Sequence, residues 1–314
     1  MRLLFILDPL EKLKAYKDTS LAIMRQAAAR DHQLFFAMQS DVFLRHQQVR
    51  VQTREFRFKD GDAWFELGSS NECAPAEFDA VLMRKDPPFD NEYLYSTYLL
   101  ELAEAQGSRV FNSPASVRGW NEKLSIARFP QFAAPFLVTC SDNLIREFLS
   151  EHGDIVVKPL DGMGGSEVYR LYSGDYNIGV ILENMTRFGQ RTIMAQRYLP
   201  AITQGDKRII VIDGQPLPYA LARIPKTGET RGNLAAGGKG VAQPLSTRDL
   251  EIATTVGAEL KRHGLFLVGL DVIGENLTEI NVTSPTGMVE IAAQTDCGPA
   301  AIFMNALQNT LASV

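Results

Sequence analysis

Two acidic side chains and one amide could bind a metal ion near the carboxyl-terminal end of the chain. Residues 266–282 predict two short strands joined by a tight turn at residues 274–276. Side chains alternate along a strand, so Glu279 and Asn281 share one face, while Asp271 lies among apolar residues of the preceding strand. A buried carboxylate must be protonated, paired or bound to a cation. Carboxylate and amide oxygens suit Mg²⁺, although a hairpin with a solvated polar face fits the pattern equally well.

A glycine-rich loop at residues 159–166 could bind phosphate. Gly162, Gly164 and Gly165 would let backbone N–H groups approach an anion closely. The loop lacks the Gly-Lys-Ser/Thr ending of a Walker A motif, and strand-forming residues follow it where a Rossmann fingerprint requires a helix. A glycine loop between two strands is typical of a flap over nucleotide phosphates, and Lys158 directly before it could add a positive charge. A glycine-rich hairpin turn is the simpler alternative.

Four basic residues stand near the ends of predicted strands, where ligands of α/β sheets collect. Arg84 and Lys85 follow a strand at residues 80–83, so they could hold a substrate carboxylate, unless they are only solvated loop charges. Arg208 and Arg223 lie near the open ends of a predicted hairpin. We interpret both as candidates for stabilising a transferring phosphoryl group and an oxyanion, against the alternative of exposed rim charges.

A long glycine-rich segment at residues 225–240 shows no apolar period and contains Arg231 and Asn233. Long loops inside compact domains are often functional lids. We therefore expect this segment to close over a reaction site.

Three predicted units would position these groups. Residues 1–121 alternate strands at 3–7, 33–38, 80–83 and 109–111 with helices from about residue 18 and over 92–106, which predicts an open α/β sheet. Residues 122–199 hold the glycine loop between strands, with a helix capped near residue 141 and another near 177–188. Residues 200–314 hold the arginine hairpin, the predicted lid, a helix at about 248–262, the acidic hairpin and a final helix at about 299–311. The fold class is therefore α/β, in two or three domains for 314 residues.

Composition and charge exclude several classes of protein. The chain is 45% hydrophobic and 22% charged, which is ordinary for a globular protein, and no apolar run is long enough to span a bilayer. A formal net charge of −5 argues against general affinity for nucleic acid or anionic membranes. No signal peptide is recognisable, and three widely separated cysteines make no metal-type spacing. A reducing cytoplasm fits these features best.

The motifs together resemble the bacterial-type glutathione synthetases of the ATP-grasp superfamily, from end to end of the chain. The most specific segments are Lys-Pro-Leu-Asp-Gly-Met-Gly-Gly at residues 158–165 and Glu-Thr-Arg-Gly-Asn-Leu-Ala-Ala-Gly-Gly at residues 229–238. Further matching segments lie at residues 83–90, 121–124, 196–208 and 269–287. One departure is Val289, where the family usually has arginine or glutamine.

The resemblance implies an α+β ATP-grasp enzyme with an open α/β amino-terminal domain (1–121), a central lid domain with the glycine flap (122–199) and a carboxyl-terminal catalytic domain (200–314). Such an enzyme ligates γ-glutamylcysteine to glycine through an acyl phosphate, with ATP as co-substrate and Mg²⁺, or alternatively Mn²⁺, as cofactor. A cytoplasmic homo-oligomer, dimer or tetramer, that binds small molecules but neither nucleic acid nor membrane is also implied.

The family pattern assigns roles to residues of this chain. Lys123 and Lys158 would bind ATP phosphates below the glycines of the flap, while Gln196, Arg197, Tyr198 and Leu199 would surround adenine and Asp206 would contact the ribose. Magnesium would be held by Asp271, Glu279 and Asn281. Arg208, Arg223 and the lid residue Arg231 are the candidate catalytic groups, and the candidate substrate contacts are Arg84, Lys85, Asn233, Ser284 and Thr286.

Two rival functions share parts of this pattern. One is an ATP-grasp ligase with other carboxylate and amine substrates, against which the Arg84-Lys85 segment and the lid sequence argue. The other is a nucleotide-binding regulator that has lost catalysis, against which the complete metal set and both hairpin arginines argue.

Overall fold

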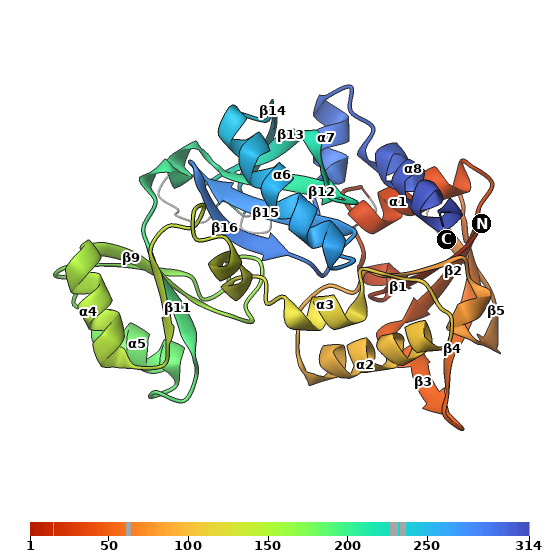
Figure 1. The fold of residues 1–314 in the computed structure, drawn as a ribbon, viewed down its shortest axis with the longest axis horizontal. Helices are drawn as coiled ribbons and strands as arrows, with labels where there is room; N and C mark the ends of the chain where they lie inside the picture. The colour runs from red at the N-terminus through yellow and green to blue at the C-terminus, as the bar shows by residue number, and fades with distance from the viewer. Residues whose placement is uncertain (15, 61–63, 227–231, 233–236, 314) are drawn as a thin grey trace.

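Three β-sheets organise the chain in a computed structural model that describes residues 1–14, 16–60, 64–226, 232 and 237–313 (Figure 1). The sheets have seven, four and five strands, and helices accompany each of them. This mixture confirms the predicted α/β class.

The amino-terminal sheet is built around parallel strands with helices between them, as predicted. Its parallel part has the order β2 (Gln33–Met38), β1 (Arg2–Leu7), β6 (Ala80–Met83), β7 (Val110–Phe111). Helices α1 (Thr19–Ala28), α2 (Asn91–Ala105) and α3 (Pro114–Gly119) connect and follow these strands. Asp18 caps α1 by accepting a hydrogen bond from the N–H of Leu21 at 2.9 Å. The helix predicted from about residue 18 and the strands at 33–38 and 80–83 are confirmed.

The prediction for this unit missed three antiparallel strands that extend the sheet at one edge. They are β3 (Val42–Arg45), β4 (Gln48–Phe58) and β5 (Phe65–Cys73). β4 carries charged residues along its exposed face, and most of β5 is polar and solvent-facing. β3 is short and β5 is mostly polar, so both give a weak hydrophobic pattern. β4 alternates, with Val49, Val51 and Phe56 buried, so the sequence carried a strand signal there that the prediction did not use. The open α/β interpretation was therefore incomplete here.

The central sheet is small, antiparallel and covered by two helices. Its order is β10 (Tyr169–Tyr172), β9 (Asp154–Pro159), β11 (Ile193–Arg197), β8 (Phe136–Thr139), with α4 (Asp142–His152) and α5 (Ile178–Thr186) as its helices. A separate apolar cluster between these helices and the sheet includes Ile145, Val157 and Leu182. The glycine loop is the connection from β9 to β10, as predicted.

The third sheet carries the arginine and acidic hairpins next to each other. Its order is β14 (Lys239–Pro244), β13 (Gln215–Ile224), β12 (Asp206–Ile212), β15 (Leu267–Ile273), β16 (Asn276–Asn281), all antiparallel. Helix α6 (Thr247–Arg262) lies on this sheet, and α7 (Met288–Gln294), which was not predicted, and α8 (Pro299–Ala312) complete the unit. In Figure 1 the blue α8 lies beside the red α1, so the two ends of the chain meet. The short 3₁₀ turns are at Leu10–Lys12, Gln39–Asp41, Pro75–Glu77, Leu124–Arg128 and Pro200–Gln204.

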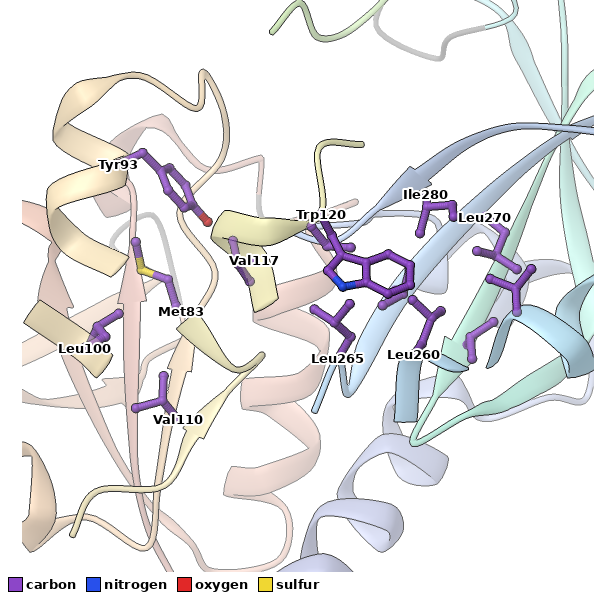
Figure 2. Packing of buried hydrophobic residues seen from close by; sticks show 14 of the residues in the cluster. Met83, Tyr93, Leu100, Val110, Val117, Trp120, Leu260, Leu265, Leu270 and Ile280 are labelled. Carbon is purple, nitrogen blue, oxygen red and sulfur yellow. The ribbon is translucent and has the colours of Figure 1, made fainter. Parts of the chain in front are cut away.

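The first and third sheets share one apolar core. Figure 2 shows Trp120 between residues of the amino-terminal unit, such as Val117, and residues of the third unit, such as Leu265 and Ile280. The buried side chain of Asn112 adds three hydrogen bonds to this contact. Its amide donates to the carbonyls of Leu267 (2.9 Å) and Val282 (2.7 Å) and accepts from the Leu267 N–H (2.8 Å). Together these contacts fix the acidic hairpin relative to the amino-terminal sheet.

No helix among the described residues combines the length and the apolar character that crossing a bilayer requires.

Replacing Asn112 with alanine should destabilise the contact between the first and third sheets. The change leaves three buried backbone groups without partners, and each such group costs on the order of 1–3 kcal/mol. We expect the free energy of unfolding, measured by urea titration, to fall by about 3 kcal/mol. Asn305→Ala on an exposed position of α8 is the control, with a change of less than about 0.5 kcal/mol. Equal stability of the two variants would contradict a structural role for Asn112.

Candidate active site

Two adjoining hollows contain most of the residues that the sequence singled out. The first hollow encloses about 920 Å³, open solvent included, and lies between the central and third sheets. Its lining includes the predicted residues Lys123, Lys158, Gly162, Gly164, Gly165, Gln196, Arg197, Tyr198, Leu199, Asp206, Asp271 and Glu279. The second hollow lies against the amino-terminal unit and is lined by Arg208, Arg223, Asn281, Ser284 and Thr286. Asp271, Glu279 and the flap glycines Gly162 and Gly164 line both hollows, so the two are continuous.

Asp271 is buried and paired with two arginines where the hollows meet. The strand register places Arg208 of β12 opposite Asp271 of β15, and the Arg208 Nη2 atom donates to Asp271 Oδ2 at 2.9 Å. Arg223 of β13 reaches the same oxygen at 2.8 Å. Burial alone would raise the pKa of Asp271, but the two guanidinium groups outweigh it and hold that pKa well below its usual range. The carboxylate is therefore ionised.

Glu279 lies opposite Asp271 on β16 and is paired with two lysines. Its Oε1 atom is 3.5 Å from Lys158 Nζ and 3.7 Å from Lys123 Nζ. Burial favours the neutral form of Glu279, but both ammonium groups lower its pKa below the ordinary value. Burial also lowers the pKa of Lys158, and Glu279 opposes that shift. The charged form of the buried Lys158 is consequently stabilised by the carboxylate beside it.

Asp206 begins β12 and has an unusual ionisation. Burial raises the pKa of Asp206 to about 6. The paired Arg223 guanidinium opposes this shift, whereas the negative charges of Asp271 and Glu279 add to it. Its Oδ1 atom is buried and has no hydrogen-bond partner among the described residues. Asp206 is one of the residues that line the first hollow.

The flap has a backbone that requires its glycines and is anchored at its base. Gly164 and Gly165 have φ of +64° and +77°, a region that favours glycine, and a Cβ on Gly162 would lie 2.6 Å from Pro159 Cγ. Arg191 pairs with Asp161 at 2.9 Å and with Glu167 at 3.1 Å, which joins both sides of the loop.

The far end of the first hollow offers unpaired hydrogen-bonding groups. Gln196 is 4% exposed, and its amide nitrogen has no partner among the described residues. The N–H groups of Arg197 and Tyr198 donate to backbone carbonyls, whereas within the described chain the N–H of Leu199 donates to none. A heterocycle with both donors and acceptors on its edge matches such a set.

The second hollow has basic residues that the sequence reasoning did not select. Lys12, Lys14 and Lys17 line it from the loop before α1, together with Asp18. Three lysines within six positions are a visible sequence signal, but nothing in the sequence places that loop opposite Arg208. Ser284 donates a hydrogen bond to Asp86 at the same hollow.

Two candidate residues do not line these hollows, and two others lie outside the described residues. Arg84 is buried behind the second hollow, where it donates to Ser20 Oγ (3.0 Å) and the Pro285 carbonyl (2.9 Å). Lys85 points to a separate hollow and pairs with Asp8 at 2.9 Å. Arg231 and Asn233 lie outside the described residues, although Gly232 between them lines the first hollow.

The residues fit a magnesium ion that is bound together with a phosphate. Asp271 and Glu279 are neighbours in the strand register, and Asn281 uses its amide nitrogen on the Gly269 carbonyl at 3.2 Å, which leaves its oxygen for another partner. No three His, Cys, Asp or Glu side chains in the described part of the chain converge as a metal site. Mg²⁺ typically takes one or two carboxylates plus substrate phosphates and water, so two carboxylates and one amide are sufficient.

Gly269 is a further residue that sequence reasoning missed. A Cβ at this position would lie 2.7 Å from Arg208 Cδ and 2.9 Å from Pro285 Cβ. The absence of a side chain therefore lets the Arg208 stem lie across β15 and reach Asp271. A glycine inside a predicted strand often marks such a close approach.

Comparisons with known proteins agree with this geometry. The family description "Prokaryotic glutathione synthetase, N-terminal domain" matches residues 1–118, and "Prokaryotic glutathione synthetase, ATP-grasp domain" matches residues 122–296. A glutathione synthetase from Nitrosomonas europaea is 58% identical over 99% of this chain and 99% of its own length. Another from Pseudomonas aeruginosa is 51% identical over 100% of this chain and 99% of its own length.

Solved structures share the fold at low sequence identity. D-cycloserine synthetase DcsG superposes with a TM-score of 0.69 at 17% identity, covering 98% of this chain and 99% of that protein. D-alanyl-alanine synthetase A from Vibrio cholerae gives a TM-score of 0.61 at 14% identity, covering 99% of this chain and 98% of that protein. With the ATP-grasp match, these likenesses confirm the predicted α+β ATP-grasp fold.

Gly269→Ala should lower turnover without unfolding the protein. The added methyl group must displace Arg208 or Pro285, and small misplacements of a catalytic group cost up to about a hundredfold in rate. We expect kcat for ATP-dependent ligation to fall by at least about tenfold. Gly68→Ala is the matched control, because its Cβ would make only an ordinary 3.5 Å contact with Glu55 on the exposed β5. Equal kcat for both variants would show that Arg208 does not need this space.

Proposed function

This chain belongs to the prokaryotic glutathione synthetase family and is therefore an ATP-dependent ligase, and we propose that its two hollows divide the substrates between them. The reaction joins γ-glutamylcysteine to glycine and yields glutathione, ADP and phosphate. The observation that carries the proposal is the buried cluster of Arg208, Arg223 and Asp271, which lies where the two hollows meet.

We assign ATP to the first hollow. Gln196, Leu199 and Asp206 each have a polar group without a partner among the described residues. The first two groups suit the edge of adenine, and the Asp206 oxygen suits a ribose hydroxyl. Lys123 and Lys158 point to the flap side, where the phosphates would lie under Gly164 and Gly165. Both lysines are already beside an acidic group, so the positive charge needed for a polyanion is in place.

We assign Mg²⁺, with Mn²⁺ as the alternative, to Asp271, Glu279 and Asn281. When bound, the ion would offset the negative charge of the transferring phosphoryl group. The donor set supports this assignment, because it consists of two carboxylates and one amide oxygen. Mg²⁺ typically completes so few protein ligands with substrate phosphates and water.

We assign γ-glutamylcysteine to the second hollow. This dipeptide has two carboxylates and one ammonium group, and the hollow offers Lys12, Lys14 and Lys17 together with the acidic Asp18 and Asp86. Ser284 and Thr286 line the side of the hollow next to Arg208. In this arrangement the cysteinyl carboxylate faces the γ-phosphate, while the γ-glutamyl end reaches the lysines.

Arg208 and Arg223 would stabilise the negative charge that develops at the reacting atoms. The carboxylate oxygen attacks the γ-phosphorus, ADP leaves, and the two guanidinium groups stabilise the charge on the phosphoryl oxygens. The glycine amine then attacks the carbonyl carbon of the acyl phosphate, and phosphate departs from the tetrahedral intermediate as the amide forms. Positive groups fixed on strands stabilise the oxyanion without reorganisation. The lid predicted at residues 225–240 would exclude water from the acyl phosphate.

We also propose a homo-oligomer in a reducing cytoplasm. Helix α2 exposes Tyr95, Tyr98 and Leu102 at helical spacing, which is consistent with a contact between copies. Three free cysteines are consistent with a reducing compartment. Light scattering across a concentration series would test the assembly, and a monomer at micromolar concentration would contradict it.

ADP release tests the assignment of substrates directly. We expect rapid release with γ-glutamylcysteine and glycine together, and slow release, coupled to hydrolysis of the acyl phosphate, with the dipeptide alone. A panel of other acids and amines separates this reaction from that of another carboxylate–amine ligase. ATP binding without turnover of this pair would contradict the proposal.

Glu279→Gln should keep the fold and lose most of the activity, because a charged ligand of the metal becomes neutral. We expect kcat to fall by about a hundredfold, with a partial recovery at high Mg²⁺. Glu275→Gln at the exposed tip of the same hairpin is the control and should retain normal kcat. Near-normal turnover of Glu279→Gln at saturating Mg²⁺ would show that this carboxylate is not an essential ligand.

A further inference from the structure

We propose that Glu122 is a positioning residue that fixes Glu279 and Asn281, and that residues 121–123 couple the acidic hairpin to the glycine flap. The inference rests on the metal site proposed above, and it concerns a residue that touches neither metal nor nucleotide in that proposal. Its basis is a set of hydrogen bonds along the outer edge of β16.

β16 is the edge strand of the third sheet, so its outward N–H groups lack a strand partner. Glu122 supplies acceptors for two of these groups. The Glu122 carbonyl accepts from the Ile280 N–H at 2.8 Å, and its carboxylate Oε1 accepts from the Val282 N–H at 3.0 Å. The same oxygen also accepts from the Thr283 N–H (3.2 Å) and hydroxyl (2.8 Å).

These bonds lie next to both proposed metal ligands on β16. Glu279 directly precedes Ile280, and Asn281 lies between Ile280 and Val282, the two residues whose N–H groups Glu122 holds. The inner side of the strand is fixed by pairing with β15. Glu122 therefore restrains the outer side of residues 280–283, and its Oε1 atom does so through three hydrogen bonds.

The residues on either side of Glu122 reach the flap. Asn121 Nδ2 donates to the Leu160 carbonyl at 3.1 Å, and Lys123 Nζ donates to the Gly162 carbonyl at 2.7 Å. Lys123 Nζ is also 3.7 Å from Glu279. Three consecutive residues thus contact both the loop assigned to phosphate and the strand assigned to metal, which fixes the distance between them.

Loss of the Glu122 acceptor should weaken metal binding more than nucleotide binding. Without it, the Val282 and Thr283 N–H groups have no partner, and the strand end that carries Asn281 is released. Outer-sphere partners of metal ligands typically contribute about 10- to 100-fold in metal affinity. Nucleotide affinity without metal depends on the first hollow, so it should not fall together with the metal affinity.

The test compares Glu122→Ala with Glu122→Gln in the full-length protein. Mn²⁺ binding in the presence of ADP, followed by electron paramagnetic resonance, gives metal affinity without turnover. We expect Glu122→Ala to raise the Mn²⁺ dissociation constant at least about tenfold, and Glu122→Gln, which keeps an oxygen acceptor, to stay within about threefold of the parent. The half-saturating Mg²⁺ concentration for turnover should move in parallel, while the dissociation constant of ADP without metal should be unchanged.

Two outcomes would overturn the inference. One is an unchanged Mn²⁺ affinity in Glu122→Ala, and the other is an equal loss in the Ala and Gln variants, which would indicate a role for charge. If Glu122→Ala does not fold, Thr283→Val replaces it: removal of one of the three bonds should weaken Mn²⁺ binding by about two- to fivefold, and no change would overturn the inference.

Glu279→Gln separates this inference from the metal site on which it rests. If Glu279→Gln weakens Mn²⁺ binding and Glu122→Ala does not, only the positioning role fails. If neither variant changes Mn²⁺ binding, the proposed metal site itself fails.

Discussion

The burial of Asp271 between two arginines is the constraint on which the rest of the site depends. A buried charge is tolerated only when it is paired and hydrogen-bonded, and removal of one partner costs several kcal/mol. Here the pairing is imposed by strand register, because β12 places Arg208 opposite Asp271 and the β12–β13 hairpin brings Arg223 beside Asp206. The basic groups are therefore fixed on adjacent strands before any substrate binds. Preorganised charge of this kind is the main resource of an enzyme that transfers phosphoryl groups.

Close approach of backbone and side chains is what makes this cluster possible. Gly269 leaves room for the Arg208 stem, and Asn112 fixes β15 against the amino-terminal unit by bonding both the N–H and the carbonyl of Leu267. The connection from the first to the central sheet also packs on the hairpin, since the Leu277 N–H donates to the Phe132 carbonyl at 2.8 Å. The acidic hairpin is thus restrained on both of its edges, one by β15 and the other by residues 122–132.

The sequence predicts which residues belong to this site better than it predicts which residues they contact. Alternation along 266–282 was enough to place Glu279 and Asn281 on one face and Asp271 among buried residues, and the glycine loop between two strands was recognisable from composition. The sequence could not tell that Arg84 turns inward to Pro285 while its neighbour Lys85 turns outward to Asp8, because both follow the same strand. Arg191 bonds Glu167 across 24 positions, and Glu122 bonds Val282 and Thr283 across 160 and 161 positions, so these contacts depend on tertiary packing. The lysines before α1 likewise meet Arg208 only in the folded chain. The short β3 and the polar β5 give little hydrophobic signal, whereas β4 alternates buried Val49, Val51 and Phe56 and was predictable from that pattern.

The charges of the site link the entry of cation and nucleotide. Each carboxylate assigned to the metal is paired here with a basic group assigned to phosphate, Asp271 with Arg208 and Arg223, and Glu279 with Lys123 and Lys158. A divalent cation alone would add positive charge beside four basic groups, and a polyphosphate alone would add negative charge beside the carboxylates. The cation alone is therefore unfavourable in a buried site, whereas the four basic groups outnumber the two carboxylates and leave a net positive charge that favours the polyphosphate. In the proposed complex the carboxylates would face the cation and the basic groups would face the phosphates, so each of these buried charges would keep a partner of opposite sign.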